Sequence, residues 1–590
     1  MKFQEKNSNL AWLHFEWLTP KKVIFILLGM GFLVYFNSLF NGFVFDDDYQ
    51  VVNNKLIRSL TNFPQFFRGS TFYFEGQSEL QGTYYKPVMT TVYSVLYALF
   101  GPRPFFFHFF QLLMHIINAI LVFLSIKYLL YQETNKNHTL SSFLAALLFL
   151  IHPINQESVA FIADLQEILF FFFGILALLF TIKGFKILSI FPLLLLSLLS
   201  KETGILFLVL IGMYLFIYAK RKLPFYLIGA TLIVGIYFIL RYIVADIPIT
   251  RLFDSPITRL SLFERALNIP AIIFYYLKTF LFPRDLISHQ FWVIKGLNFE
   301  EFYLPLLAIA LFLTTLLYGG IRVMRSKNHL LKTYLFFLLW FWIGLGFHLH
   351  IFPIDATVAD RWFYLPIVGL LGVGVVGTQT FEVKSNIFKN IGVFLLIVII
   401  IALSSRTIIR NFDWRDTITL FTHDIKLAKD PYDLEYGLAV ELGKRERYDE
   451  AIAHLINLTR SPRHIWPNWY YIGLFYEKKG DVENAKKAFA RAVEESKKTD
   501  RGPIDLAYEK LAILMLYHVE PKETKQWVKE ALQRLPENPK LWLVLALAEY
   551  KLKNSQEALF AARKAYNLLP DEESYYILSQ LEQNLPIELK

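Results

Sequence analysis

The stretch KKVIFILLGMGFLVYFNSLFNGFVFDDD, residues 21–48, decides the fold of this chain. Its apolar run is long enough to cross the roughly 30 Å hydrocarbon core of a bilayer as a helix. The run ends at three consecutive carboxylates, Asp46, Asp47 and Asp48. Because an unpaired charge in hydrocarbon is strongly unfavourable, the triplet should lie at a membrane surface. It is there either a polar stop to the helix or part of an acidic site.

The composition indicates an integral membrane protein with a further domain. The chain has 590 residues, of which 55% are apolar, and it contains no cysteine. Disulfides and thiolate metal sites are therefore excluded. The N-terminus shows no small-residue cleavage site before the apolar run, so we expect the first helix to be retained. The net charge of +10 falls in short clusters between apolar runs, a pattern typical of membrane loops rather than of nucleic-acid binding.

We predict about eleven membrane spans. They lie near residues 22–40, 105–131, 139–152, 160–182, 185–199, 203–219, 223–244, 302–321, 333–352, 362–380 and 386–408. With this count all basic clusters fall on one side: Lys21 and Lys22, Lys136, Lys183 and Lys186, residues 220–222, Arg322 to Lys332, and Lys384 with Lys389. The positive-inside rule then predicts a cytoplasmic N-terminus. Two shorter apolar segments, 88–100 and 266–283, are expected to lie in the interface.

The connections on the opposite side hold the unusual polar residues. These connections are 41–104, 152–159, 200–202, 245–301 and 353–361, and besides the triplet they contain Lys86, His152, Glu157, Lys201, Glu202, Asp355, Asp360 and Arg361. Acidic, imidazole and cationic groups that converge on one membrane face predict a polar cavity. Structural roles are the alternative: a helix-end ion pair, a helix terminator and a snorkelling anchor. Inside a span, His115 and Asn118 are expected to form interhelical hydrogen bonds.

A repetitive segment follows the membrane part. Aligning Glu435, Trp469, Tyr508 and Trp542 places small or apolar residues in phase sixteen positions later, at Ala451, Ala485, Thr524 and Ala558. The run from Trp469 to Tyr476 matches the tetratricopeptide pattern. We therefore predict a membrane domain over 1–410, a linker over 411–430, and about four repeats with a capping helix over 431–590. The fold class is all-α, a polytopic helix bundle followed by an α-solenoid.

This combination resembles the transmembrane and tetratricopeptide-repeat O-mannosyltransferases, a family within the GT-C glycosyltransferases. The resemblance rests on residues 42–48, 85–87, 99–101, 108–118, 152–160, 200–202 and 359–366. It implies transfer of a monosaccharide from a polyprenyl-phosphate donor to an acceptor hydroxyl at the non-cytoplasmic face, by an inverting displacement. The repeats would recruit a protein acceptor, with contacts expected near Trp469, Tyr476 and Trp542, although such repeats also serve oligomerisation or scaffolding.

The resemblance also implies site roles. An acidic residue of the first outer loop lies beside the acceptor in such enzymes, so the catalytic candidates are Asp46, Asp47 and Asp48, with Asp47 as the first choice. A hydroxyl that attacks an anomeric carbon needs a base, and a leaving phosphate needs cations or donors. The candidates for binding donor or substrate are Lys86, His152, Glu157, Lys201, Glu202 and Arg361. Arg361 is favoured for the phosphate because a guanidinium forms two parallel hydrogen bonds.

Two departures from the family pattern leave the sugar open. No arginine stands in residues 163–167, where the family usually has one shortly before an aspartate, and Asp360 replaces a glutamate. No metal is expected; if a divalent cation such as Mg²⁺ or Mn²⁺ binds, Asp46 and Asp47 are its candidate ligands. Short loops and the lack of cysteine favour a bacterial inner membrane with periplasmic repeats over the endoplasmic reticulum with lumenal repeats. Two alternatives stay open: transfer to a lipid-linked glycan or envelope polysaccharide, and a non-catalytic membrane scaffold.

Overall fold

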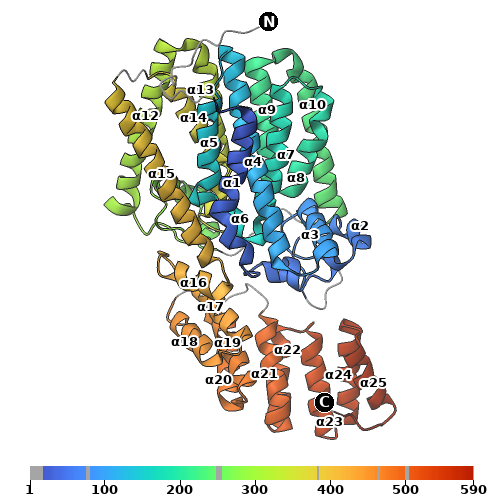
Figure 1. Ribbon diagram of the computed structural model, residues 1–590. Coiled ribbons are helices and arrows are strands. Elements are labelled where there is room, and N and C mark those ends of the chain that lie inside the picture. The colour runs from blue at the N-terminus through green and yellow to red at the C-terminus, as the bar shows by residue number, and fades with distance from the viewer. Residues whose placement is uncertain are drawn as a thin grey trace. The chain divides into compact units, whose positions relative to one another are not determined.

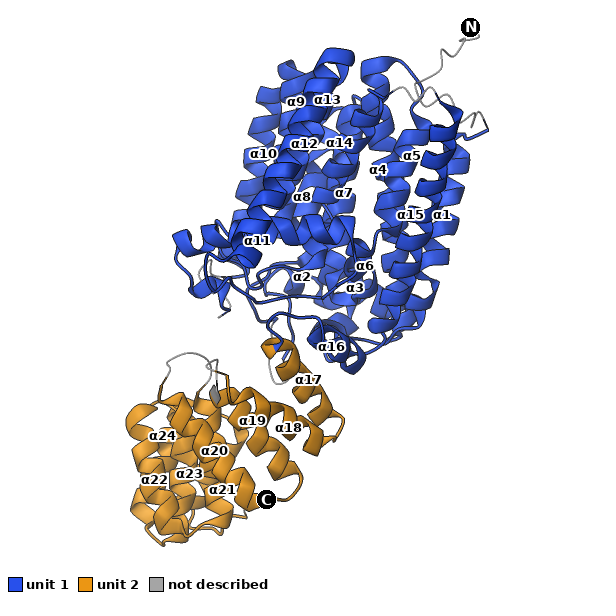
Figure 2. Cartoon of the chain, turned by 90° about the vertical axis from the view of Figure 1, so that its left-hand side faces the viewer, with its two compact units in different colours: residues 1–431 blue, residues 432–590 orange. Residues whose placement is uncertain are grey.

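The computed structural model describes residues 17–74, 80–247, 255–381, 385–461, 465–498 and 504–588. Two compact units make up the chain, Met1–Pro431 and Tyr432–Lys590 (Figure 2). The described residues are overwhelmingly helical, and their only β contacts are two isolated bridges, Phe72 with Gln81 and Gln290 with Val358. The predicted all-α class is therefore confirmed.

The first unit is a bundle of long apolar helices with short helices at one end. Its α-helices are α1 Pro20–Tyr35, α2 Phe63–Phe66, α3 Pro87–Phe100, α4 Pro104–Thr134, α5 Thr139–Ile151, α6 Gln156–Ala160, α7 Leu165–Ile182, α8 Phe191–Ser200, α9 Ile205–Tyr218, α10 Leu223–Phe238, α11 Leu262–Leu281, α12 Leu304–Ser326, α13 Leu331–Gly346, α14 Pro366–Thr378, α15 Asn386–Asp413 and α16 Thr417–Ile425. Figure 1 shows α4, α5 and α7 side by side, and α2, α3 and α6 gathered at one end of the bundle.

The number of spans differs from the prediction of eleven, which is not confirmed. In the described part of the chain, seven helical segments are long and apolar enough to cross a membrane, or eight if the bent pair Thr139–Ile151 and Pro153–Ala160 counts as one span. Three predicted spans correspond instead to shorter apolar segments, Ile187–Ser200, Glu202–Tyr218 and Pro366–Thr378. Hydropathy alone does not separate these from full spans because buried helices in a bundle are just as apolar.

Helices of the bundle approach closely where small residues allow it. A Cβ atom added to Gly174 of α7 would lie 2.0 Å from the ring of Phe207 on α9. Glycine at this position lets the two backbones pack around that ring. The same helices carry polar segments at one end, so their packing fixes where the outer loops meet.

The segment predicted to be a linker, 411–430, is instead part of the first unit. α15 continues to Asp413, and Trp414 and Asp424 are fully buried. Arg410, also buried, forms an ion pair with Asp424 at 2.8 Å. The sequence does not indicate this because the hydropathy falls here, whereas the segment is buried by tertiary contacts, among them the ion pairs of Arg410 with Asp413 and Asp424.

The second unit is a series of helical hairpins. Its helices are α17 Tyr432–Lys444, α18 Tyr448–Leu458, α19 Ile465–Lys478, α20 Val482–Ser496, α21 Asp505–His518, α22 Pro521–Arg534, α23 Pro539–Lys551, α24 Ser555–Leu568 and α25 Glu572–Glu582. The in-phase residues Ala451, Ala485, Thr524 and Ala558 have no exposed surface. Their burial explains the repeat, because only small side chains fit where successive helices pack.

Candidate active site

A cavity of about 300 Å³, hereafter the first cavity, lies where the predicted outer loops of the first unit meet. Its lining includes five residues predicted from the sequence: Asp46, Lys86, Lys201, Glu202 and Arg361. It also includes Tyr84, Asp164, Arg241, His348 and Asp355. Four cations and four carboxylates therefore line one half-open space. Such a concentration of ionisable groups at a membrane protein's helix ends indicates a functional site.

The three aspartates of the triplet have different environments. Asp47 has no exposed surface, and its two oxygens accept hydrogen bonds from the backbone N–H of Val44 at 2.8 Å and of Ala163 at 2.7 Å. Asp48 begins a π-helical turn, Asp48–Val52, and is not among the residues that line the first cavity. Asp46 is half-buried and lines the cavity. Asp47 thus anchors the loop, and Asp46 is the carboxylate that can meet a substrate.

The pKa of Asp46 is suited to accepting a proton. Burial raises this pKa from 3.8 to about 6, although the positive charges of Arg361 and Lys86 offset part of the rise. A carboxylate with a pKa near 6 is ionised at neutral pH, and it holds a proton more firmly than an ordinary aspartate.

The acidic loop is held by the end of α15 and by α16. The N–H of Gly42 donates to the carbonyl of Arg415, and the N–H of Phe45 donates to Oγ1 of Thr417, both at 3.0 Å. The ring of Phe45 packs edge-on against Phe421, with 5.5 Å between centroids. Phe45 has a φ of 52°, which is unusual for a bulky residue and needs surrounding contacts to maintain it. These contacts fix the backbone directly before Asp46.

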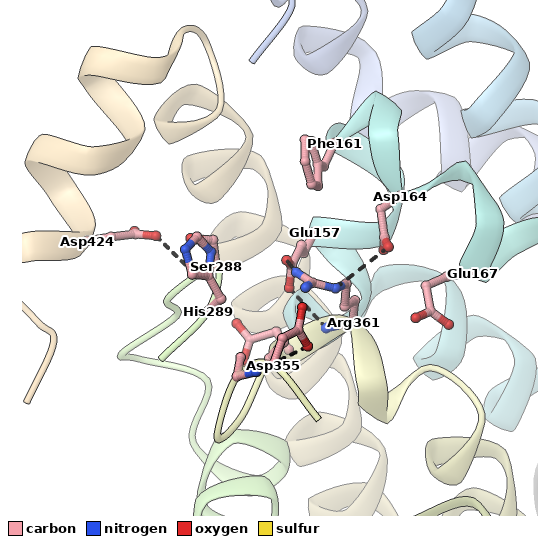
Figure 3. Close-up of polar contacts among 12 residues, drawn as sticks. Glu157, Phe161, Asp164, Glu167, Ser288, His289, Asp355, Arg361 and Asp424 are labelled. Atoms are coloured by element: carbon pink, nitrogen blue, oxygen red, sulfur yellow. Dashed lines mark hydrogen bonds and ion pairs between the residues drawn. The ribbon is translucent and has the colours of Figure 1, made fainter. Parts of the chain in front are cut away.

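A buried network fixes a second loop beside the acidic one. Asp424 accepts a hydrogen bond from the backbone N–H of Ser288 at 2.9 Å while it pairs with Arg410. The ring of the neighbouring His289 stacks on Phe45 with 5.7 Å between centroids. Figure 3 shows the contact between Asp424 and Ser288 on one side of Arg361. The pair formed by Arg410 and Asp424 therefore acts on the acidic loop through Ser288 and His289.

Arg361 is held by two buried carboxylates. Its guanidinium pairs with Glu157, and its backbone N–H donates to Glu157 Oε2 at 3.0 Å. Its Nε lies 3.8 Å from Asp164 Oδ1. Figure 3 shows the guanidinium between these two side chains, with Asp355 close by. Although burial opposes its charge, Glu157 and Asp164 raise the pKa of Arg361, so the arginine stays cationic.

Lys86 differs from the other cations of the first cavity. Lys201 pairs with Glu167, and Arg241 pairs with Glu202 at 2.6 Å. Within the described ranges no carboxylate forms an ion pair with Lys86, whose Nζ instead lies 4.2 Å from the centroid of the Tyr84 ring. Burial lowers the pKa of Lys86, since its side chain is only 4% exposed. A buried ammonium without an ion-pair partner is ready to bind an anion.

Tyr84 and Arg241 also line the first cavity. The hydroxyl of Tyr84 donates to Asp355 Oδ2 at 2.5 Å. Arg241 also donates to the carbonyl of Thr83 at 3.1 Å, so its guanidinium ties α10 to the loop that carries Lys86. Carboxylates and guanidinium groups fixed in this way can orient hydroxyl groups of a small polar ligand.

Arg241 and His348 were missed as site residues. Each lies within a segment predicted to be a span, 223–244 and 333–352. An ionisable residue inside an apolar span is itself a signal of function, and it would have identified both. Asp164 is not predicted as a site residue by the sequence. Its approach to Arg361 depends on the tertiary fold.

Besides Asp47 and Asp48, two of the predicted binding residues, His152 and Glu157, lie outside the cavity lining. Nδ1 of His152 accepts the N–H of Ile154 at 3.1 Å, and its Nε2 lies 3.0 Å from the carbonyl of Phe280. His152 is therefore engaged in shaping the bend after α5. Glu157 acts on the cavity only through Arg361. In the bundle, His115 Nδ1 lies 2.8 Å from the hydroxyl of Tyr364, the kind of interhelical contact that was expected there.

The predicted acceptor residues are partly buried in the second unit. Trp469, Tyr476 and Trp542 pack against its hydrophobic core. The indole N–H of Trp542 donates to the carbonyl of Pro536 at 2.8 Å. These contacts account for the three side chains as parts of the repeat, and a role in acceptor binding stays a prediction.

The residues present do not fit a divalent cation held by Asp46 and Asp47. Both oxygens of Asp47 accept backbone N–H groups, so they face donors rather than a metal. Across the described residues no group of three or more His, Asp or Glu side chains is placed to hold a metal ion.

Comparisons with known proteins agree with this architecture. A family model described as tetratricopeptide repeat matches residues 436–499, which contain α18, α19 and α20. The chain is 23% identical to protein O-mannosyl-transferase TMTC3 of Homo sapiens over 628 residues, which cover 91% of this chain and 67% of that protein. The chain is similar to the protein O-mannosyl-transferases. Protein O-mannosyl-transferase F38B6.6 of Caenorhabditis elegans is 25% identical over 425 residues, or 71% of this chain and 60% of the relative. This chain thus spans about two thirds of the length of these relatives.

Proposed function

We propose that this protein is a membrane glycosyltransferase that moves a monosaccharide from a polyprenyl-phosphate donor to a hydroxyl of a protein. The observation that carries the proposal is the first cavity, in which a half-buried carboxylate, Asp46, and a buried ammonium without an ion-pair partner, Lys86, line the same space. The similarity of the chain to relatives named protein O-mannosyl-transferases supports mannose as the first sugar to test. A lipid donor explains why the site is built among membrane helices, since the prenyl chain must lie in the bilayer.

The proposed step is a single displacement at the anomeric carbon. Asp46 accepts the proton of the acceptor hydroxyl as its oxygen forms a bond to that carbon. The bond between the anomeric carbon and the phosphate oxygen breaks, and its electron pair stays on the phosphate. Lys86 then stabilises the charge that develops on the phosphate. One displacement inverts the configuration at the anomeric carbon.

Two assignments change from the sequence-based ones. We assign the base to Asp46 rather than to Asp47, because Asp47 uses both oxygens to hold the loop. We assign the phosphate first to Lys86 rather than to Arg361, because Glu157 and Asp164 already neutralise Arg361. Arg361 keeps a role as a fixed positive charge beside Asp46, and Glu202 with Arg241 is placed to orient sugar hydroxyls.

The second unit is proposed to recruit the acceptor on the non-cytoplasmic side. Tetratricopeptide repeats form extended surfaces that bind polypeptides. In a bacterium this side would be the periplasm, and in a eukaryote the lumen of the endoplasmic reticulum.

Sugar transfer by the full chain tests the proposal. The protein in membranes is supplied with labelled polyprenyl-phosphate mannose, and in parallel with other polyprenyl-phosphate sugars, together with acceptor proteins. We expect label on protein, and no label when Asp46 is replaced by asparagine. If label appears only on lipid-linked glycan, the acceptor class is wrong. If no donor is consumed, the enzyme proposal fails.

A further inference from the structure

A second cavity of about 270 Å³ lies in the first unit, distant from the proposed active site. Its lining includes Lys136, Lys327, His329 and Glu133, together with two deeply buried polar side chains, His138 and Gln379. The volume is about nine times the roughly 30 Å³ that one water occupies in the liquid. The space can therefore hold more than a structural water.

The two cavities lie at opposite ends of the same helices. Leu330, directly before α13, lines the second cavity, whereas His348, two residues after α13, lines the first. α14 runs the other way, from Trp362 near its start at the first cavity to Gln379 at the second. The 16 residues of α13 span about 24 Å at 1.5 Å per residue. The second cavity therefore opens on the membrane face opposite to the active site, where the basic loops gather.

The charges of the second cavity favour an anion. No described carboxylate forms an ion pair with Nζ of Lys136 or Lys327, and Glu133 is the one carboxylate among the described residues of its lining. His138 is held in place by a 2.8 Å hydrogen bond to Oγ1 of Thr134, which itself donates to the carbonyl of Leu130. The lining is mostly polar, which favours a polar occupant over an apolar one. The ammonium groups of Lys136 and Lys327 favour a negatively charged occupant.

We propose that the second cavity binds a phosphate group, either in the headgroup of an anionic phospholipid or in a soluble phosphate ester. Lysine ammonium groups bind phosphate as point charges. The cavity lies at helix ends, at the depth where phospholipid headgroups meet the protein, and anionic lipids are attracted to basic loops on the cytoplasmic face. The inference does not depend on the glycosyltransferase reaction.

Native mass spectrometry of the full chain in an uncharged detergent tests the proposal. Phosphatidylglycerol is titrated against phosphatidylcholine, and in a second arm sodium phosphate is compared with sodium chloride at equal ionic strength by the melting temperature. The cavity variant combines Lys136→Gln with Lys327→Gln. The control combines Lys220→Gln with Lys222→Gln, which removes the same charge from a basic loop that does not line the cavity. A third variant, Lys136→Arg combined with Lys327→Arg, keeps the charge.

Wild type, control and arginine variants should retain phosphatidylglycerol or respond to phosphate, whereas the cavity variant should bind at least tenfold more weakly. Binding of phosphatidylglycerol without a response to phosphate identifies a lipid headgroup as the source, and a response to phosphate identifies a soluble ester. Equal weakening in the cavity and control variants would overturn the proposal, because it would show diffuse attraction to the basic face. Equal retention of both lipids with no response to phosphate would overturn it as well.

Discussion

Raising the pH from 5 to 7 should increase the rate of sugar transfer about tenfold. The reason is the pKa of Asp46, which burial raises to about 6. The base must be ionised to accept a proton, so activity follows the deprotonated fraction and is lost as the pH falls. That fraction is about one eleventh at pH 5 and about ten elevenths at pH 7. An aspartate with an ordinary pKa near 3.8 would already be over nine-tenths ionised at pH 5, and the rate would barely change.

Initial rates with labelled donor, measured on the full chain in detergent between pH 5 and 7, check this expectation. Asp48→Asn is the matched control, because it removes a neighbouring carboxylate that does not line the first cavity. It should stay active, and its profile should shift only slightly to lower pH, because the negative charge of Asp48 raises the pKa of Asp46 less than burial or the charge of Asp355 does. Melting temperatures across the same range separate titration of the base from unfolding. A rate that stays flat from pH 5 to 7 in a folded protein would refute the assignment of Asp46 as the base.

Three further changes probe the other parts of the site. Lys86→Gln should slow transfer roughly 10- to 150-fold, the range for losing a hydrogen bond to a charged group. Lys86→Arg keeps the charge and should keep part of the rate. Equal rates for the two variants would exclude a role for the charge. Thr417→Val removes the acceptor of the hydrogen bond from the N–H of Phe45, so kcat should fall while KM for the donor stays unchanged. Thr417→Ser keeps the hydroxyl and should restore kcat. A change in KM alone would contradict a role in positioning Asp46. Asp424→Asn breaks the buried pair with Arg410, which costs about 3–5 kcal/mol and should lower the melting temperature; an unchanged melting temperature would contradict the pairing.

The sequence was sufficient to predict that charged groups from separate loops meet in one polar cavity. The positive-inside rule assigned the outer loops, and the structure brings Asp46, Lys86, Lys201, Glu202 and Arg361 from three of these loops into one cavity. Charged groups are unfavourable in hydrocarbon, so their positions in the sequence indicate the ends of the helices. Repeat periodicity likewise identified the helical hairpins of the second unit.

Individual roles within the site could not be predicted. Three adjacent aspartates are equivalent in sequence, and Asp47 differs from Asp46 through its burial and the hydrogen bonds that it accepts from the N–H groups of Val44 and Ala163. The positive charge of Arg361 is offset in part by Asp164, which lies far from it in the chain and approaches it only in the folded protein. The segment 411–430 differs from the predicted linker because tertiary contacts bury it, among them the ion pairs of Arg410 with Asp413 and Asp424. The count of eleven spans is not confirmed, because three of the predicted spans correspond to shorter apolar helices of 10–17 residues.

The central claim is that Asp46 takes the proton and Asp47 holds the loop. Transfer activity and melting temperature of Asp46→Asn, Asp47→Asn and Asp48→Asn, measured side by side at equal expression, test it most directly. Asp46→Asn should abolish transfer with a melting temperature near that of the wild type. Asp47→Asn should lower the melting temperature, because its amide group cannot accept from both N–H groups and leaving one unpaired costs about 1–3 kcal/mol; Asp48→Asn should be active. An active Asp46→Asn protein would contradict the account.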